Sequence, residues 1–253
     1  MPGRSPAPTR PGPRRVLITA GHRAVALFAT AGMLSTVAIA GACVVSGSAR
    51  RTLPLASPDS ALLSAAAPDS FDVRFETSKG PFTMRVHRDW APRGADRVYY
   101  LVRARFYDGV RFFRVVNGRD GKPFVAQFGI SGDPAVSRVW RGARIADDPP
   151  RRSNVRGTVA FAAGGPNTRT TQIYINYRDN SRLDTLGFAV FGQVIRGMAV
   201  TVDSFYFGYG EGGRGGTGPN QQEIVAEGNA YLIRQFPKLD YVVTARIAEE
   251  WRR

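Results

Sequence analysis

Alternating apolar and polar positions begin at Phe71. The stretches 71–77 and 82–87 both alternate in the manner of half-buried strands, and a Ser-Lys-Gly-Pro turn at 78–81 separates them. Together they predict a β-hairpin. Residues 91–105 come next, with apolar side chains at helical spacing, which predicts one amphipathic helix.

Short apolar segments separated by Gly, Asn, Asp and Pro clusters occupy most of the remaining chain. They predict strands at 110–116, 124–128, 157–162, 172–176, 188–194 and 240–247. Two further helices are predicted at 197–205 and 220–235, the second after a glycine-rich loop at 208–218. Many short strands with few helices favour a mainly β fold, a barrel with helices covering its ends.

The N-terminal region has a different pattern. Seven arginines and no acidic residue precede Leu53, and the stretch from Ala24 to Val45 carries no charge. Basic residues before an apolar segment direct the rest of the chain across a membrane, and this segment, at about 22 residues, is long enough to span a bilayer. Its end, Ala40-Gly41-Ala42-Cys43, fits a signal-peptide cleavage site and also resembles a bacterial lipobox, in which Cys43 would be lipidated.

These features predict an exported protein of the periplasm or cell envelope, tethered to a membrane. A lipoprotein held through Cys43, an uncleaved anchor and a released protein all remain open. We expect a signal peptide or anchor over 1–45, a flexible Ser/Ala/Pro linker over 46–70 and a single domain over 71–250. Roughly 180 residues are enough for one full hydrophobic core, and we expect a monomer.

The net charge of +15 falls to +8 once the seven arginines before Leu53 are set aside. A basic balance can indicate nucleic-acid binding. Here the arginines are scattered and no nucleic-acid motif accompanies them, so we expect a generally basic surface and no nucleic-acid partner.

Cysteine and histidine are scarce, with Cys43, His22 and His87 the only ones. This excludes an intramolecular disulfide, a Cys/His catalytic pair inside the domain and a thiolate- or histidine-rich metal site, so we expect no metal and no cofactor. Asp147-Asp148 is interpreted as part of a solvated loop, with metal binding the less favoured interpretation. The G-x-G-x-x-G spelling at 208–213 is interpreted as a flexible loop, because no helix comes directly after it.

One charged residue lies inside an apolar run, Arg114 in Phe112-Phe113-Arg114-Val115-Val116. Burying an unpaired charge is expensive, so this arginine needs a partner or points into a working cleft.

The motifs around Arg114 narrow that choice. In chain order they are Phe106-Tyr-Asp-Gly-Val-Arg-Phe-Phe-Arg-Val-Val-Asn-Gly, Phe124-Val-Ala-Gln, Gly157-Thr-Val-Ala-Phe-Ala-Ala-Gly-Gly-Pro-Asn-Thr-Arg-Thr-Thr-Gln-Ile-Tyr-Ile-Asn, Leu183-Asp and Gly187-Phe-Ala-Val-Phe-Gly-Gln-Val. From about Phe71 to Asp203 the chain resembles the cyclophilin peptidyl-prolyl cis–trans isomerases. The resemblance implies an eight-stranded antiparallel barrel capped by two helices, to which this chain adds an extra C-terminal loop and helix.

The resemblance also implies which residues form the site. The catalytic group would consist of Arg114, Phe124 and Gln127. The substrate-binding residues would be Val125, Ala162, Ala163, Gly164, Gln172, Tyr174, Leu183 and Phe188. Proline-containing polypeptides would be the substrates.

These residue types suit the rotation of an X-Pro bond. The barrier to that rotation is about 18–20 kcal/mol because resonance must be broken, and cis and trans X-Pro forms differ by only about 1 kcal/mol. No nucleophile is needed, only an apolar pocket for the proline ring and a donor aimed at charge that is present in the twisted state. We expect Arg114 to bond the proline carbonyl and stabilise the lone pair on the imide nitrogen, with Gln127 orienting Arg114 or a water.

The sequence therefore predicts an isomerase that assists the folding of exported proteins. The alternative is a catalytically weak module of the same fold that binds proline-containing segments as a chaperone. Arg114 favours the first, because a pure binder has no need of a transition-state donor.

Three departures from the family pattern carry further expectations. Five additional residues at 119–123 would narrow access if their turn folds over the cleft. Arg182 stands where many members have a tryptophan, so we expect weak sensitivity to cyclosporin. The stretch 208–235 exceeds the usual family length, and the sequence alone assigns it no role.

Overall fold

A computed structural model describes residues 55–58, 63, 65–118, 120–213 and 215–252. The predicted leader and Cys43 lie outside the described residues. Within the part of the chain that is described, no helix combines the length and the apolar character that a bilayer crossing requires.

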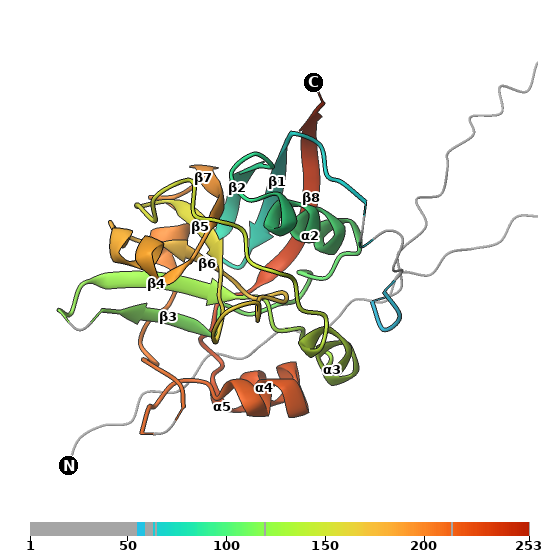
Figure 1. Cartoon of the computed structure of the whole chain (residues 1–253). Helices are drawn as coiled ribbons and strands as arrows, with labels where there is room; N and C mark the ends of the chain where they lie inside the picture. The colour runs from blue at the N-terminus through green and yellow to red at the C-terminus, as the bar shows by residue number, and fades with distance from the viewer. Residues whose placement is uncertain (1–54, 59–62, 64, 119, 214, 253) are drawn as a thin grey trace, which may run out of the picture. The chain divides into compact units, whose positions relative to one another are not determined.

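Eight strands form one antiparallel sheet, as predicted (Figure 1). The strands are β1 (Ser70–Thr77), β2 (Gly80–His87), β3 (Arg114–Asn117), β4 (Pro123–Phe128), β5 (Thr158–Phe161), β6 (Ile173–Asn176), β7 (Val190–Arg196) and β8 (Val242–Trp251). Their order across the sheet is β3-β4-β6-β5-β7-β2-β1-β8. The mainly β fold and the β1–β2 hairpin are thereby confirmed.

The two edge strands, β3 and β8, approach each other without forming a continuous ladder. An isolated bridge joins Arg111 to Tyr241, and the Phe112 amide donates to the Asp240 carbonyl at 2.9 Å. The sheet is therefore strongly curled but not closed, and this corrects the expectation of a complete barrel. It also shortens the strand predicted at 110–116, whose first residues form the bridge region.

Helices are few. The α-helices are α2 (Pro92–Arg103), α3 (Pro134–Arg141), α4 (Gln221–Glu227) and α5 (Asn229–Gln235), and the 3₁₀ helices are η1 (Ser181–Leu186) and η2 (Val202–Ser204). Helix α2 is the one predicted from apolar spacing, and it packs against β8, β7 and β2.

The other two helix predictions need correction. The stretch 197–205 contains only the three-residue η2, so a second long capping helix is not formed there. The stretch 220–235 is broken into α4 and α5 at Gly228, where φ is +63°, a conformation that favours glycine. The break allows the Asn229 amide to donate to the Gly132 carbonyl at 2.9 Å.

Some described residues ahead of β1 pack on the domain. Ala67 is buried in the main core, and its amide donates to Asp96 at 2.8 Å. The Trp140 indole donates to the Leu55 carbonyl at 2.9 Å. Within the range predicted as a linker, these residues therefore contact the domain.

The strands divide their side chains between two apolar clusters. The main core is rich in aromatic residues, with Phe75 stacked on Phe82 at a centroid distance of 4.6 Å and Phe112 stacked on Phe205 at 4.0 Å. A smaller cluster contains Val116, Val125, Ala160, Tyr174, Leu183 and Val190. Because side chains alternate along a strand, one set of strands supplies both clusters from its two faces.

Candidate functional site

Strand register places one row of residues across five neighbouring strands. Arg114 pairs with Gln127, Gln127 with Tyr174, Tyr174 with Ala160, and Ala160 with Val190. Directly paired residues lie on the same face of a sheet. The row therefore carries the arginine of β3 onto the face that holds the smaller apolar cluster.

A β-bulge adds Phe124 to this face. Val116 pairs with Val125 while Asn117 pairs with Pro123, so Phe124 has no direct partner on β3. An extra residue of this kind re-aims its side chain. Phe124 and its neighbour Val125 consequently both pack with the smaller cluster, although neighbours in a regular strand point to opposite faces.

A cavity of about 310 Å³ lies over this row. Its lining consists of Arg114, Phe124, Val125, Gln127, Ala162, Ala163, Tyr174, Leu183, Phe188 and Gln221. The structure thus brings together all three residues predicted as catalytic and six of those predicted to bind substrate. Gly164 and Gln172 are not among the lining residues, and Gln221, at the start of α4, was not predicted.

Arg114 is held from the pocket side by a chain of amides. Its Nη1 donates to Gln127 Oε1 at 3.1 Å, and Gln127 Nε2 donates to Gln172 Oε1 at 2.9 Å. The guanidinium carbon lies 5.8 Å from the centroid of the Phe124 ring. Gln172 does not line the cavity, and its side chain contacts the site through the buried side chain of Gln127.

A second partner of Arg114 comes from the stretch 208–235, here called the C-terminal insertion. Arg114 Nε donates to Glu211 Oε2 at 2.7 Å, and Nη2 donates to Glu211 Oε1 at 2.6 Å. The Arg114 side chain is 24% exposed and that of Glu211 is 53% exposed, so the ion pair is not buried. Sequence reasoning anticipated a partner or a cleft for this arginine, and the structure supplies both.

The same insertion bounds another cavity on the far side of Arg114. It has a volume of about 510 Å³ and is lined by Phe113, Arg114, Glu211, Gly212, Gly213, Pro219, Asn220, Gln221 and Gln222. Arg114 and Gln221 line both cavities, so the guanidinium lies at the boundary between a strand-built hollow and a loop-built one.

Behind the pocket, fully buried Asn154 joins two residues of its wall, Tyr174 and Phe188, to Asp184. It accepts a hydrogen bond from the Tyr174 hydroxyl at 2.9 Å, and its Nδ2 donates to the Phe188 carbonyl at 2.8 Å and to Asp184 Oδ1 at 2.7 Å. Burial raises the pKa of Tyr174, which keeps the phenol protonated as a donor. Asn154 was not predicted, because it lies in a loop without a recognisable motif.

The carboxylate of Asp184 belongs to the same support. Burial alone would raise its pKa, but hydrogen bonds from Ser153 and Asn154 outweigh burial and bring the pKa below its usual value. The Asn154 amide also donates to Asp184 Oδ1, at 2.9 Å. The charged form of Asp184 is therefore the one that holds the Asn154 loop.

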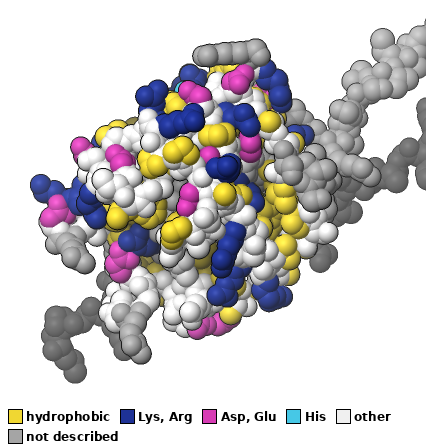
Figure 2. Space-filling view, in the orientation of Figure 1, with side chains coloured by type: hydrophobic (Ala, Val, Ile, Leu, Met, Phe, Trp, Pro, Cys, Tyr) yellow, Lys and Arg dark blue, Asp and Glu magenta, His cyan; other side chains and the backbone are white. Residues whose placement is uncertain are grey.

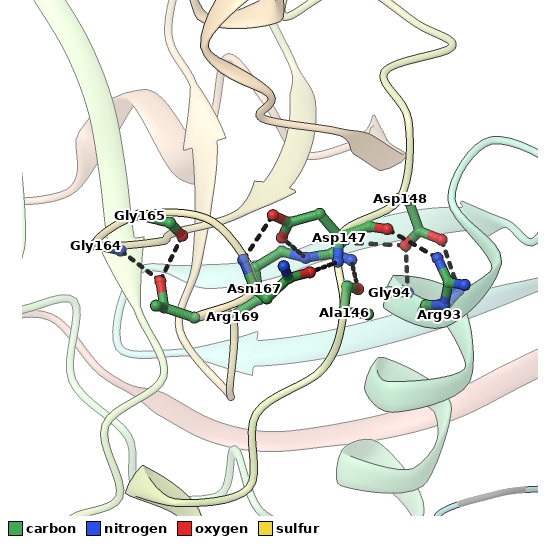
Figure 3. Close-up of polar contacts among 10 residues, drawn as sticks. Arg93, Gly94, Ala146, Asp147, Asp148, Gly164, Gly165, Asn167 and Arg169 are labelled. Carbon is green, nitrogen blue, oxygen red and sulfur yellow. Dashed lines mark hydrogen bonds and ion pairs between the residues drawn. The ribbon is translucent and has the colours of Figure 1, made fainter.

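The segment after Ala162 and Ala163 is anchored by the ion pairs drawn in Figure 3. Buried Arg169 pairs with Asp148 and Asp147, each at 3.1 Å. Asp148 in turn accepts hydrogen bonds from the backbone amides of Arg93 and Gly94 at the start of α2. The N-cap residue of this helix, Ala91, makes no side-chain hydrogen bond, so Asp148 takes over that role.

These contacts give the Asp147-Asp148 pair a structural role. Its oxygens accept hydrogen bonds from arginine and from backbone amides, including that of Asn167. The sequence had indicated only a solvated loop at this pair. Among the described residues, no group of three or more His, Cys, Asp or Glu side chains is arranged to hold a metal ion.

The described residues of the additional turn, 120–123, do not line the pocket. Lys122 and Pro123 line a different cavity, of about 450 Å³, and Asp120 pairs with Arg178. Arg182 places its guanidinium carbon 5.1 Å from the centroid of the Phe124 ring, at the rim of the site. The expectation of weak cyclosporin sensitivity stays a prediction.

Basic side chains are distributed over the surface. Figure 2 shows Lys and Arg spread across the visible face and interspersed with acidic and apolar side chains, without a continuous stripe. Several are paired with carboxylates, as Arg85 is with Asp72 and Arg246 with Asp108.

Comparison with known proteins identifies the region that holds this pocket. The family model described as "Cyclophilin type peptidyl-prolyl cis-trans isomerase/CLD" matches residues 72–204. Glu211, Gln221 and the rest of the C-terminal insertion lie beyond the matched residues.

Curated relatives match the same region. Peptidyl-prolyl cis-trans isomerase CYP18-2 of Arabidopsis thaliana is 32% identical over 51% of this chain and 77% of its own length. Peptidyl-prolyl cis-trans isomerase of Acinetobacter baylyi is 32% identical over 55% of this chain and 74% of its own. Peptidyl-prolyl cis-trans isomerase CYP65 of Arabidopsis thaliana is a longer relative, matched over 21% of its length at 30% identity.

A solved structure shares the fold. The crystal structure of a cyclophilin type peptidyl-prolyl cis-trans isomerase from Cryptosporidium parvum aligns with a TM-score of 0.50 and 18% identity. The alignment covers 72% of this chain and 99% of the other.

Proposed function

The chain belongs to the cyclophilin-type peptidyl-prolyl cis-trans isomerase family, and we propose that its Arg114 pocket catalyses rotation about X-Pro peptide bonds. The observation that carries this proposal is the cavity of about 310 Å³, in which one guanidinium faces apolar side chains such as Phe124, Val125 and Leu183. An apolar hollow with a few convergent polar groups is the usual form of a small binding site.

The pocket suits the two requirements of the reaction. The apolar wall binds the pyrrolidine ring, and Arg114 donates to the proline carbonyl and to the lone pair that localises on the imide nitrogen as resonance is lost. That lone pair is available only in the twisted state, so the interaction lowers the barrier without tightening ground-state binding to the same degree.

The ion pair with Glu211 leaves donors for this role. An arginine has five N–H groups. Glu211 accepts from two of them and Gln127 from one, which leaves one on Nη1 and one on Nη2. Nη1 is the nitrogen on the side of Gln127, a residue of the cavity wall.

The test is exchange kinetics on an Ala-Pro peptide, measured by NMR with the wild type and with Arg114→Ala. We expect catalysis by the wild type and a loss of about 100-fold or more in kcat/KM in the variant, as for other single transition-state donors. Arg196→Ala, which removes an exposed arginine outside the cavity, serves as the matched control. Wild-type exchange no faster than buffer would favour the alternative, a proline-binding module with little turnover.

The finer proposal concerns where the isomerase works. We propose that it assists the folding of exported proteins while tethered to a membrane. The support is in the sequence: seven arginines and no acidic residue before Leu53, an uncharged stretch from Ala24 to Val45, and the Ala40-Gly41-Ala42-Cys43 segment.

Fractionation of cells and mass spectrometry of the mature N-terminus test this proposal. A chain that begins at a lipid-modified Cys43 would support the lipoprotein, and an intact N-terminus in the membrane fraction would support the uncleaved anchor. A full-length chain recovered only from the cytoplasm would contradict both.

A further inference from the structure

The C-terminal insertion presents Glu211 to the catalytic arginine by means of a tightly packed loop. Gly210, Gly212, Gly216 and Gly218 lie where two arms of the loop approach each other, and the Gly218 amide donates to the Glu211 carbonyl at 2.8 Å. A Cβ on Gly212, Gly216 or Gly218 would clash with a backbone oxygen of the opposite arm. The glycines expected to give a flexible loop are instead required by this close approach.

Aromatic contacts fix the base of the same loop. The Tyr209 ring packs edge-on against Phe236 and Tyr206, with centroid distances of 5.0 Å in both cases. The Thr217 hydroxyl donates to the Tyr209 carbonyl at 2.7 Å, and the Lys238 amide donates to the Tyr209 hydroxyl at 3.1 Å. The backbone at Glu211 is thus attached to the apolar cluster beneath α5.

We propose that Glu211 is a positioning residue for the isomerase reaction, fixing the guanidinium plane of Arg114 before substrate arrives. The inference rests on the proposed function. Glu211 contacts the Nε–Nη2 edge and Gln127 contacts Nη1, so the guanidinium is held at both sides. A bidentate carboxylate adds geometric specificity that a single bond does not.

The geometry favours positioning over inhibition. The edge taken by Glu211 is not the one bonded to the pocket residue Gln127, so donors on the pocket side stay available. Glu211 is also 53% exposed, so solvent weakens the effect of its negative charge on the guanidinium. Holding a long side chain in place beforehand removes an ordering cost from the transition state.

The experiment measures kcat and KM of the full chain on an Ala-Pro peptide for Glu211→Ala and Glu211→Gln. We expect Glu211→Ala to lower kcat by about tenfold, as small misplacements of a catalytic group do, with KM within about twofold of the wild type. Glu211→Gln keeps one acceptor oxygen, so its kcat should fall between those of the wild type and Glu211→Ala. Glu227→Gln, which removes an exposed carboxylate paired with Arg234 outside both cavities, is the matched control.

Two further measurements separate positioning from a structural role. In an Arg114→Ala background, Glu211→Ala should have no additional effect on kcat, because residues that act as a unit are not additive. The order parameter of the Arg114 Nε–H bond, measured by ¹⁵N NMR, should be high in the wild type and lower in Glu211→Ala.

Unchanged or higher kcat in Glu211→Ala would overturn the inference while leaving the isomerase intact. An equal loss of kcat in both backgrounds would also overturn it, because Glu211 would then act independently of Arg114. A wild type without activity would instead overturn the proposed function on which the inference depends.

Discussion

On one side of Arg114 the site is built by neighbouring strands, and on the other side by a loop about 97 residues further along the chain. The strand side results from register, which carries Gln127, Tyr174 and Ala160 into one row. The loop side depends on glycines that let two backbone arms touch. We therefore expect changes on the strand side to affect folding, and changes on the loop side to disturb the sheet less.

The largest effect should come from the support of the strand side. Asn154→Ala removes the partner of Tyr174, Phe188 and Asp184 at a fully buried position. Leaving such groups unsatisfied should lower the free energy of unfolding by about 2–3 kcal/mol, measured by urea denaturation, and should raise KM. Asn117→Ala, at an exposed asparagine, is the control, and equal losses in both variants would contradict the assigned role.

A smaller effect, on activity alone, should come from the loop side. Gly216→Ala places a Cβ against the Glu211 carbonyl and displaces the carboxylate from Arg114. We expect kcat to fall by about threefold to tenfold, with less than about 1 kcal/mol lost in stability. Gly142→Ala, where the added Cβ has room, is the control. A loss of stability as large as that of Asn154→Ala would remove the distinction between the two sides.

The smallest effect should appear in acid. Because the pKa of Asp184 is lowered in the folded protein, its contribution to stability is complete above the unfolded value, about 3.9, and is lost as pH falls through the folded value. Asp184→Asn should therefore flatten the dependence of unfolding free energy on pH in that acid range, as measured by urea denaturation. Glu227→Gln controls for the change in net charge. An unaltered slope in Asp184→Asn would mean that the loop at Asn154 is held by other contacts.

The same comparison explains what the sequence could predict. Strand-borne residues such as Arg114, Val125 and Tyr174 were assigned to the site through the resemblance to the cyclophilins, whose motifs are local in the sequence. Even Phe124 was assigned to the pocket, although the bulge that directs it there was not foreseen. Glu211 and Asn154 were not predicted, because contacts between distant loops leave no periodic pattern in the sequence.

Two helix errors have different causes. Helix α3 was missed although Asp133-Pro134 is a recognisable start signal, with the Asp133 carboxylate accepting from the Ala135 amide at 2.8 Å. The helix predicted at 197–205 was overridden by tertiary packing, in which buried Phe205 stacks on Phe112 of the bridge region. Apolar spacing alone does not distinguish such a turn from a helix.

The row of paired residues also limits how much of a substrate the sheet can read. Adjacent strands lie about 4.8 Å apart, whereas an extended peptide advances about 3.3 Å per residue. A chain crossing the row would therefore pass roughly two strands for every three residues, and it would leave the five-stranded patch after about six residues. We therefore expect this surface to discriminate only among the few residues on either side of the proline, which would allow it to accept many unrelated sequences.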